Sequence, residues 1–199
     1  MARPNSLLRT GRLVVRQEAR ALMELAEKMD TRFSQACEII LRTSGRVVVI
    51  GIGKSGHVGR KIAATLASTG TPAFFVHAGE AAHGDLGMIK TSDVVLAISN
   101  SGETPELIEI VPPLRKIGAR VVAITGNAAS SLGRMADVVV EAQVEREAGP
   151  LGLAPTTSST VALVLGDALA MALVKARRFS RKDFADLHPG GQLGRILSE

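Results

Sequence analysis

Five short runs of β-branched and aliphatic residues constrain the fold more than any other feature of the sequence. They are Val47–Ile50, Ala73–Val76, Val94–Ile98, Arg120–Ile124 and Val138–Val140. Polar residues do not alternate with the apolar ones, which is typical of strands buried on both faces. Segments of helical period lie between several runs, at His57–Ser68, Pro105–Ile117 and near Leu132, and another follows at Ser158–Arg178. This alternation predicts an α/β fold in which helices cover both faces of a parallel sheet.

The N-terminal segment is helical by its hydrophobic period. Apolar residues recur every three or four positions between residues 7 and 42. Asp30 is placed to end one helix and cap a second, and Gly45 ends the pattern. We therefore expect residues 1–44 to form a helical segment packed on residues 45–199, in a single domain overall. A chain of 199 residues is long enough to bury a sizeable core.

Composition narrows the classes of partner. Trp and Tyr are absent and there are five Phe, which excludes modules that bind RNA by stacking bases on aromatic side chains. The net charge of +5 attracts anions in general, phosphorylated metabolites among them. We interpret the basic run Lys175–Lys182 as a solvated helix end, and we expect no nucleic-acid partner.

The number of cysteines and the hydropathy of the sequence indicate the cellular compartment of the protein. Cys37 is the single cysteine, so no internal disulfide can form, and we expect it to pack as a small apolar side chain. The sequence lacks the run of about 18 apolar residues that a membrane span needs, and its start lacks the apolar segment of a signal peptide. These features predict a cytoplasmic protein without a membrane partner.

Ligands of parallel α/β sheets bind beyond the carboxyl ends of the strands. The loops at these ends are therefore the first candidates for a binding site. GIGKSG follows the first strand, and Gly51, Gly53 and Gly56 spell GxGxxG. A dinucleotide site would need an acidic residue at the end of the second strand, where His77 stands, and a Walker A loop would need glycine in place of Val48. A tight strand–helix turn accounts for the glycines but leaves Lys54 and Ser55 unexplained.

SNSGETPE, after the third strand, is more informative. Ser99, Ser101 and Thr104 place three hydroxyls before a helix that starts at Pro105. The free N–H groups of a helix start bind phosphate well. Thr104 alone is explained equally by a simple N-cap, but the other two hydroxyls are not, so we predict a phosphate loop. Capping is a sufficient explanation for a second hydroxyl cluster, TTSST at 156–160.

Four residues stand out as acid–base candidates: Lys54, Glu106, Glu147 and His188. Glu106 falls in a first helical turn, where a carboxylate is stable for structural reasons alone. Glu147 falls in the loop EREAGPLG with no obvious structural duty, and His188 falls in the turn-rich segment HPGG. Each residue taken singly also has a structural explanation.

Taken together, GIGKSG, HAGEAAHGDLGM, ISNSGETPE, PLGLAPTTSST and HPGGQLGR resemble the sugar isomerase (SIS) family, and within it the D-arabinose 5-phosphate isomerases, from Val47 to Arg195. The resemblance implies a flavodoxin-like three-layer α-β-α sandwich with a five-stranded parallel sheet. It implies an aldose–ketose isomerase that interconverts D-ribulose 5-phosphate and D-arabinose 5-phosphate through an enediol, without a cofactor, and feeds Kdo, lipopolysaccharide or capsule synthesis. Isomerases of other sugar phosphates and non-catalytic sugar-phosphate sensor domains remain alternatives.

The resemblance also implies roles for particular residues. It assigns Lys54, Glu106, Glu147 and His188 to catalysis, Ser55, Ser99, Ser101 and Thr104 to phosphate binding, and Gly70, Thr71, His77 and His83 to the sugar site. It implies a homotetramer with active sites at subunit boundaries. No metal is required, although His77 is a candidate for an inhibitory zinc site.

These roles give a mechanism as an expectation. Glu147, with Glu106 as the alternative, moves the proton, and a water-poor pocket would raise its pKa toward the working pH. His188 moves protons at the oxygens or helps open the sugar ring, and Lys54 stabilises the enediolate charge or orients the substrate. The sequence departs from the family pattern at Ala78 and Gly149, where Pro and Cys are common. It ends at Glu199, where many members continue into a CBS pair.

Overall fold

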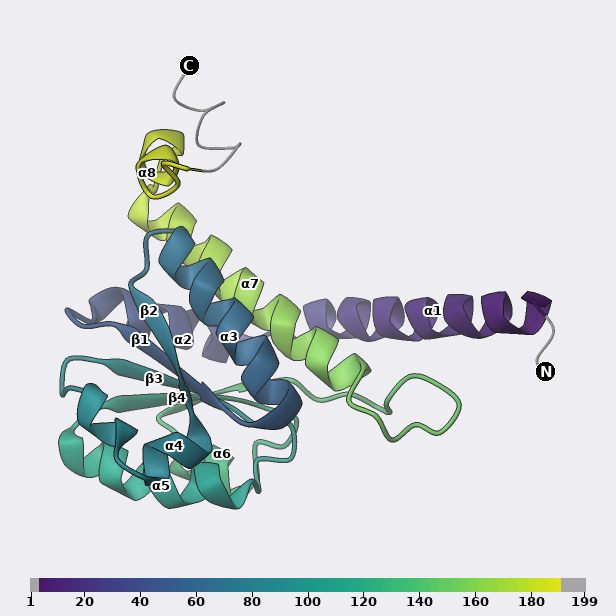
Figure 1. The fold of residues 1–199 in the computed structure, drawn as a ribbon, viewed down its shortest axis with the longest axis horizontal. Helices are drawn as coiled ribbons and strands as arrows, with labels where there is room; N and C mark the ends of the chain where they lie inside the picture. Colours follow the sequence, from purple (N-terminus) through teal and green to yellow (C-terminus); the bar gives the residue numbers. More distant parts are fainter. Residues whose placement is uncertain (1–3, 191–199) are drawn as a thin grey trace.

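The computed structural model describes residues 4–190, and its centre is one parallel five-stranded sheet (Figure 1). The strands are β1 (Val47–Gly51), β2 (Ala73–His77), β3 (Val94–Ile98), β4 (Arg120–Thr125) and β5 (Val138–Glu141). Their order is β2-β1-β3-β4-β5, the order of flavodoxin-like doubly wound folds. The predicted α/β sandwich is therefore confirmed.

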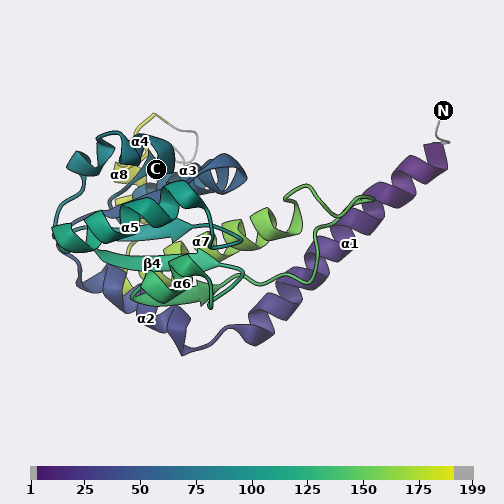
Figure 2. The same ribbon diagram turned by 90° about the horizontal axis from the view of Figure 1, so that it is seen from below.

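Helices cover both faces of this sheet (Figures 1 and 2). On one face lie α2 (Thr31–Arg42), α3 (Gly53–Ser68) and α7 (Thr157–Arg177). On the other lie α4 (Ala78–Ala82), α5 (Pro105–Ile117) and α6 (Ser131–Met135). The remaining elements are α1 (Pro4–Lys28), the 3₁₀ turn η1 (Asp85–Met88) and α8 (Arg181–Asp186).

The position of the strands between two layers of helices explains why their sequences are apolar throughout. Successive side chains of a strand point to opposite faces. In β1, Val47 and Val49 join the core beneath α3 and α7, whereas Val48 and Ile50 join the core beneath α5. Both faces of the sheet are buried beneath helices, so no position along the strand favours a polar residue.

The helix starts differ most from the sequence-based prediction. α3 begins at Gly53, four residues before the predicted start, because the glycine-rich loop itself forms its first turn. The short elements α4 and η1 were not predicted, since four or five residues give no helical period. Asp30 does cap α2, as predicted: its side chain accepts the N–H of Arg32 at 2.9 Å.

Helix α1 is an arm that only partly lies on the sandwich. Its C-terminal half packs on the core through Leu22 and the buried Leu25, and the hydroxyl of Thr160 in α7 donates to Glu18 at 3.0 Å. Its N-terminal half extends well beyond the sheet (Figures 1 and 2). There Leu7 and Val15 are 63% and 68% exposed, although their helical spacing continues the same apolar stripe.

Strand β2 is one edge of the sheet, and an arginine covers each of its two phenylalanines. The guanidinium of Arg46 lies 4.4 Å from the ring centre of Phe74, and that of Arg60 lies 4.4 Å from the ring centre of Phe75. Such cation–π contacts place positive charge on both faces of an edge strand.

Helix α7 is the one described helix that is long and apolar enough, with a mean hydropathy of 1.7, to satisfy the length and composition test for a membrane span. Half of that stretch is buried in the sandwich, where Leu165, Leu169 and Leu173 are inaccessible. The central helix of a core satisfies the same test. The basic run at its end is exposed, with Arg178 in the left-handed conformation at φ +54°.

Candidate functional site

Three helix starts meet at the carboxyl edge of the sheet. α3 follows β1, α5 follows β3 and α7 follows β5. Between them lies a cavity of about 300 Å³, at the small end of ligand cavities. Its lining is Ile52, Lys54, Ser55, Val58, Ile98, Ser99, Asn100, Ser101, Thr104, Ile124, Ala142, Pro155, Ser158, Ser159 and Ala162. It therefore brings together Lys54 and all four predicted phosphate-loop residues.

The loop after β3 is built around Ser99. This side chain is buried, its Oγ lies 2.8 Å from Oγ1 of Thr104, and it accepts the N–H of Gly102 at 3.0 Å. Thr104 occupies the N-cap position of α5 but makes no side-chain capping bond, so simple capping does not explain it. Pro105 has no N–H, and the N–H groups of Leu107 and Ile108 donate to the carbonyl of Thr104, so the N–H of Glu106 and the positive end of the helix dipole are what the first turn of α5 offers an anion.

Lys54 supplies the positive charge of the cavity. It stands in the first turn of α3, whose N-cap residue Ile52 has no capping side chain. Among the described residues it has no ion-pair partner, whereas Lys61 on the same helix pairs with Asp167 at 2.5 Å. A free ammonium group next to uncapped helix starts makes this cavity attractive to phosphate and to enediolate charge.

Glu147 has a structural duty that the sequence did not reveal. Its Oε2 accepts the backbone N–H groups of Thr156 at 2.9 Å and Ser158 at 3.1 Å, and Oε1 accepts the hydroxyl of Ser158. The carboxylate thus closes the start of α7. Burial alone would raise the pKa of Glu147, but these hydrogen bonds outweigh it and hold the pKa below its usual value. The expected rise of its pKa is absent in the single chain.

The other predicted residues at this edge lie around the cavity rather than in its wall. Glu106 is half-buried in the first turn of α5. His77 ends β2 beside Gly51, its partner in the sheet register, and its Nδ1 is buried without a hydrogen-bond partner. His83 ends α4 and is exposed.

Gly70, Thr71 and His188 lie at the other end of the molecule. Gly70 and Thr71 precede β2, and a Cβ at Gly70 would lie 2.4 Å from the ring of Phe179 beyond the end of α7. His188 follows α8, and its ring stacks on Phe184 at 3.9 Å. Figure 1 shows α8 beyond the C-terminal end of α7. The 21 residues of α7 separate the two ends by about 31 Å. Gly70, Thr71 and His188 of one chain therefore cannot line the cavity that contains Lys54 of the same chain.

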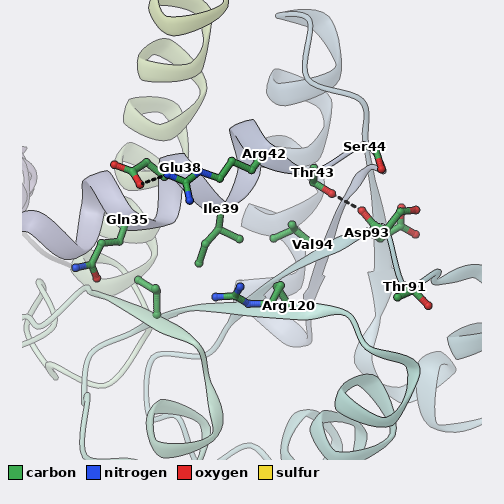
Figure 3. A pocket seen from close by; sticks show the side chains of 12 residues that line it. Gln35, Glu38, Ile39, Arg42, Thr43, Ser44, Thr91, Asp93, Val94 and Arg120 are labelled. Atoms are coloured by element: carbon green, nitrogen blue, oxygen red, sulfur yellow. Dashed lines mark hydrogen bonds and ion pairs between the residues drawn. The ribbon is translucent and has the colours of Figure 1, made fainter.

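A second hollow, of about 520 Å³, lies at the amino edge of the sheet beneath α2 (Figure 3). It contains none of the predicted site residues. Its charged side chains are engaged with the protein: Arg42 pairs with Glu38 at 3.3 Å, and Arg120 pairs with Asp137 at 3.0 Å. Asp93 accepts the N–H groups of Arg46 and Lys90. The cavity at the carboxyl edge is therefore the candidate site.

Within residues 4–190, no group of three His, Cys, Asp or Glu side chains has the geometry to hold a metal ion. His77, the candidate for an inhibitory zinc site, therefore belongs to no such group among the described residues.

Sequence reasoning missed three polar residues of the cavity wall as site residues: Asn100, Ser158 and Ser159. Asn100 stands between two predicted phosphate-loop serines, and Ser158 and Ser159 belong to the TTSST cluster. The signal was present, but helix capping explained the hydroxyl cluster sufficiently.

Comparison with known proteins gives a consistent picture. The SIS domain family matches residues 40–172. The arabinose 5-phosphate isomerases KdsD of Yersinia pestis and Pseudomonas aeruginosa are 56% and 57% identical over 94% and 90% of this chain. The chain spans only 57% and 55% of their lengths. The Escherichia coli CFT073 protein c3406, solved in complex with arabinose 5-phosphate, is 45% identical with a TM-score of 0.91, and the match covers 94% of this chain and 100% of that one.

Proposed function

This chain belongs to the SIS domain family, and we propose that it is an aldose–ketose isomerase that interconverts D-ribulose 5-phosphate and D-arabinose 5-phosphate. One observation carries the proposal: an unpaired lysine and a hydroxyl-lined loop share a cavity of sugar-phosphate size with three helix starts. The names of the similar proteins support the choice of substrate. The product would supply Kdo, lipopolysaccharide or capsule synthesis in the cytoplasm.

The substrate phosphate would bind at the starts of α3 and α5. Ser55, Ser101 and Thr104 surround these starts, and Ser99 orders the loop between them. Backbone N–H groups and the dipole ends of both helices favour a dianion there. This anchoring would fix the rest of the sugar relative to the acid–base groups.

The reaction moves a proton between C1 and C2 of the sugar through an enediol. A carboxylate takes the proton from one carbon and returns it to the other, so no electron acceptor is needed. We assign this step to Glu147, with Glu106 as the alternative. Lys54 would stabilise the negative charge that develops on the enediolate oxygen. His188 would move protons at the sugar oxygens.

A second copy of the chain has to complete such a site. Lys54 and His188 lie at opposite ends of α7, and Gly70 and Thr71 lie at the His188 end. We infer that one copy supplies the phosphate loops with Lys54, and that a neighbouring copy supplies Gly70, Thr71 and His188. A homotetramer with sites at subunit boundaries satisfies this requirement.

The exposed stripe of α1 supports self-association. Leu7 and Val15 continue the apolar stripe that Leu22 and Leu25 bury on their own core. Leu151 and Leu153, in the loop that runs alongside α1 in Figure 2, are 79% and 78% exposed. Exposed apolar patches of this kind typically mark protein–protein contacts.

Val15→Glu should dissociate the assembly. A charge buried without a partner costs about 3–5 kcal/mol, and a two-fold interface would contain it twice. Size-exclusion chromatography with light scattering should show a shift toward monomer, with the circular dichroism of the fold retained. Arg9→Gln changes the charge equally on the opposite face of α1 and should leave the assembly intact. An unchanged mass for Val15→Glu would contradict a role of this stripe.

The activity is tested with purified protein, ribulose 5-phosphate and EDTA, with products identified by NMR. Arabinose 5-phosphate is the expected product. Conversion of a different sugar phosphate would favour another isomerase branch. Binding without turnover in the intact assembly would favour a sensor domain.

A further inference from the structure

Ser158 connects the cavity to Glu147. Its side chain is only 4% exposed and lines the cavity together with Lys54. Among the described residues that line the cavity, Ser158 alone hydrogen-bonds the carboxylate of Glu147. It does so twice: its hydroxyl donates to Oε1, and its backbone N–H donates to Oε2 at 3.1 Å. One residue therefore fixes both oxygens of the carboxylate.

The direction of these bonds determines their chemical effect. A hydroxyl has a single proton to donate, and here it is directed at Oε1. Donors directed at both oxygens stabilise the carboxylate over the carboxylic acid and fix the plane of the group. The hydroxyl of Thr156, 3.3 Å from Oε2, and its N–H complete the set.

We propose that Ser158 is a positioning residue: it holds the carboxylate of Glu147 in a fixed orientation and in its charged form beside the cavity. The inference rests on the proposed isomerase function, in which Glu147 moves the proton. Ser158 itself exchanges no proton with the substrate. Its hydroxyl gives the TTSST cluster a use beyond helix capping.

Neighbouring charges do not account for the state of Glu147. Among the described residues, its carboxylate has no ion-pair partner, and the causes that shift its pKa are burial and the bonds from Thr156 and Ser158. On the facing helix α1, Glu18 accepts the Thr160 hydroxyl and Arg20 pairs with Glu24. Arg16 of α1 lines a neighbouring hollow together with Glu145 and Arg146 of the loop, and Lys54 of α3 lines the cavity that Ser158 also lines.

Ser158→Ala should raise the pKa of the Glu147 carboxyl by about one pH unit, because the charged form loses a donor. The acidic limb of the pH profile of kcat/KM should move to higher pH by a similar amount, since a base works only when deprotonated. Carboxyl ¹³C NMR titration of the full chain measures the first effect, with the Glu147 signal identified by its loss in Glu147→Gln.

Ser159→Ala is the matched control. Ser159 also lines the cavity, but its hydroxyl shares its one proton between the backbone carbonyls of Pro155 and Thr156, at 3.0 and 2.9 Å, and does not donate to Glu147. It should leave the Glu147 titration in place, and Ser158→Thr, which keeps a hydroxyl, should restore it. An unchanged titration in Ser158→Ala, or an equal change in Ser159→Ala, would overturn the inference.

The two proposals fail separately. An unsubstituted protein that does not isomerise ribulose 5-phosphate would refute the proposed function. The carboxyl titration requires no turnover, so it still decides whether Ser158 controls the charge of Glu147.

Discussion

Lys54→Met should lower kcat/KM for ribulose 5-phosphate by about 10²–10³-fold, the usual effect of removing one group that stabilises developing negative charge. The folded state should lose little, because Lys54 is exposed and has no ion-pair partner among the described residues. The free energy of unfolding should stay within about 0.5 kcal/mol of its original value. Steady-state kinetics and urea unfolding measure the two quantities. Nearly full activity in Lys54→Met would remove the main support for the proposed site.

The proposal that two copies share each site allows a stronger version of this test. His188→Ala should also be inactive, yet mixing and reassembling it with Lys54→Met should restore activity. If each site takes Lys54 from one copy and His188 from another, about a quarter of the sites in a random mixture of equal parts contain both residues. Activity that stays at the level of the separate variants would mean that both residues act from the same chain.

Gly102→Ala should be the most destabilising single-methyl change in the phosphate loop. Gly102 has φ +67°, and a Cβ there would lie 2.0 Å from Oγ of Ser130. Ser130 cannot move away easily, because it is buried and its hydroxyl caps α6 by accepting the N–H of Gly133. Left-handed backbone and overpacking together should lower the free energy of unfolding by about 2–5 kcal/mol.

Gly53→Ala separates the two causes. Gly53 has a similar φ of +59°, but a Cβ there would meet no heavy atom within 4 Å. Only the backbone cost of about 1–2 kcal/mol should remain. Urea unfolding at one fixed protein concentration gives both values. Equal losses at the two glycines would show that the contact with Ser130 relaxes without cost.

The sequence predicts the strands well because each is short, apolar and buried on both faces. Val94–Ile98 and Pro105–Ile117 have the predicted bounds in the structure. The loops after β1 and β3 could be predicted as a site from the rule for parallel sheets, and Lys54 and Ser99 do share one cavity. The first residue of a helix is harder to predict. The glycines of GKSG favour a turn, although this segment forms the first turn of α3.

The rest of the site depends on distances that one sequence does not contain. Nothing in HPGG indicates that α7, about 31 Å long, leads away from the cavity before α8 and His188 are reached. The pKa of Glu147 depends on its hydrogen bonds with Thr156 and Ser158. The loop between these residues has no periodic sequence pattern, so its conformation could not be predicted. Composition likewise does not indicate which half of α1 packs against the core of the sandwich.

The two arginines over β2 limit the ways in which copies of this chain can assemble. A β2-to-β2 contact between two copies would extend the sheet across both molecules and would bring two copies of Arg46 and Arg60 close together. Like charges at such a junction oppose pairing of two sheets through this edge. Contacts through helical surfaces carry no such cost, so the two arginines favour association through the helices over association through the β2 edge.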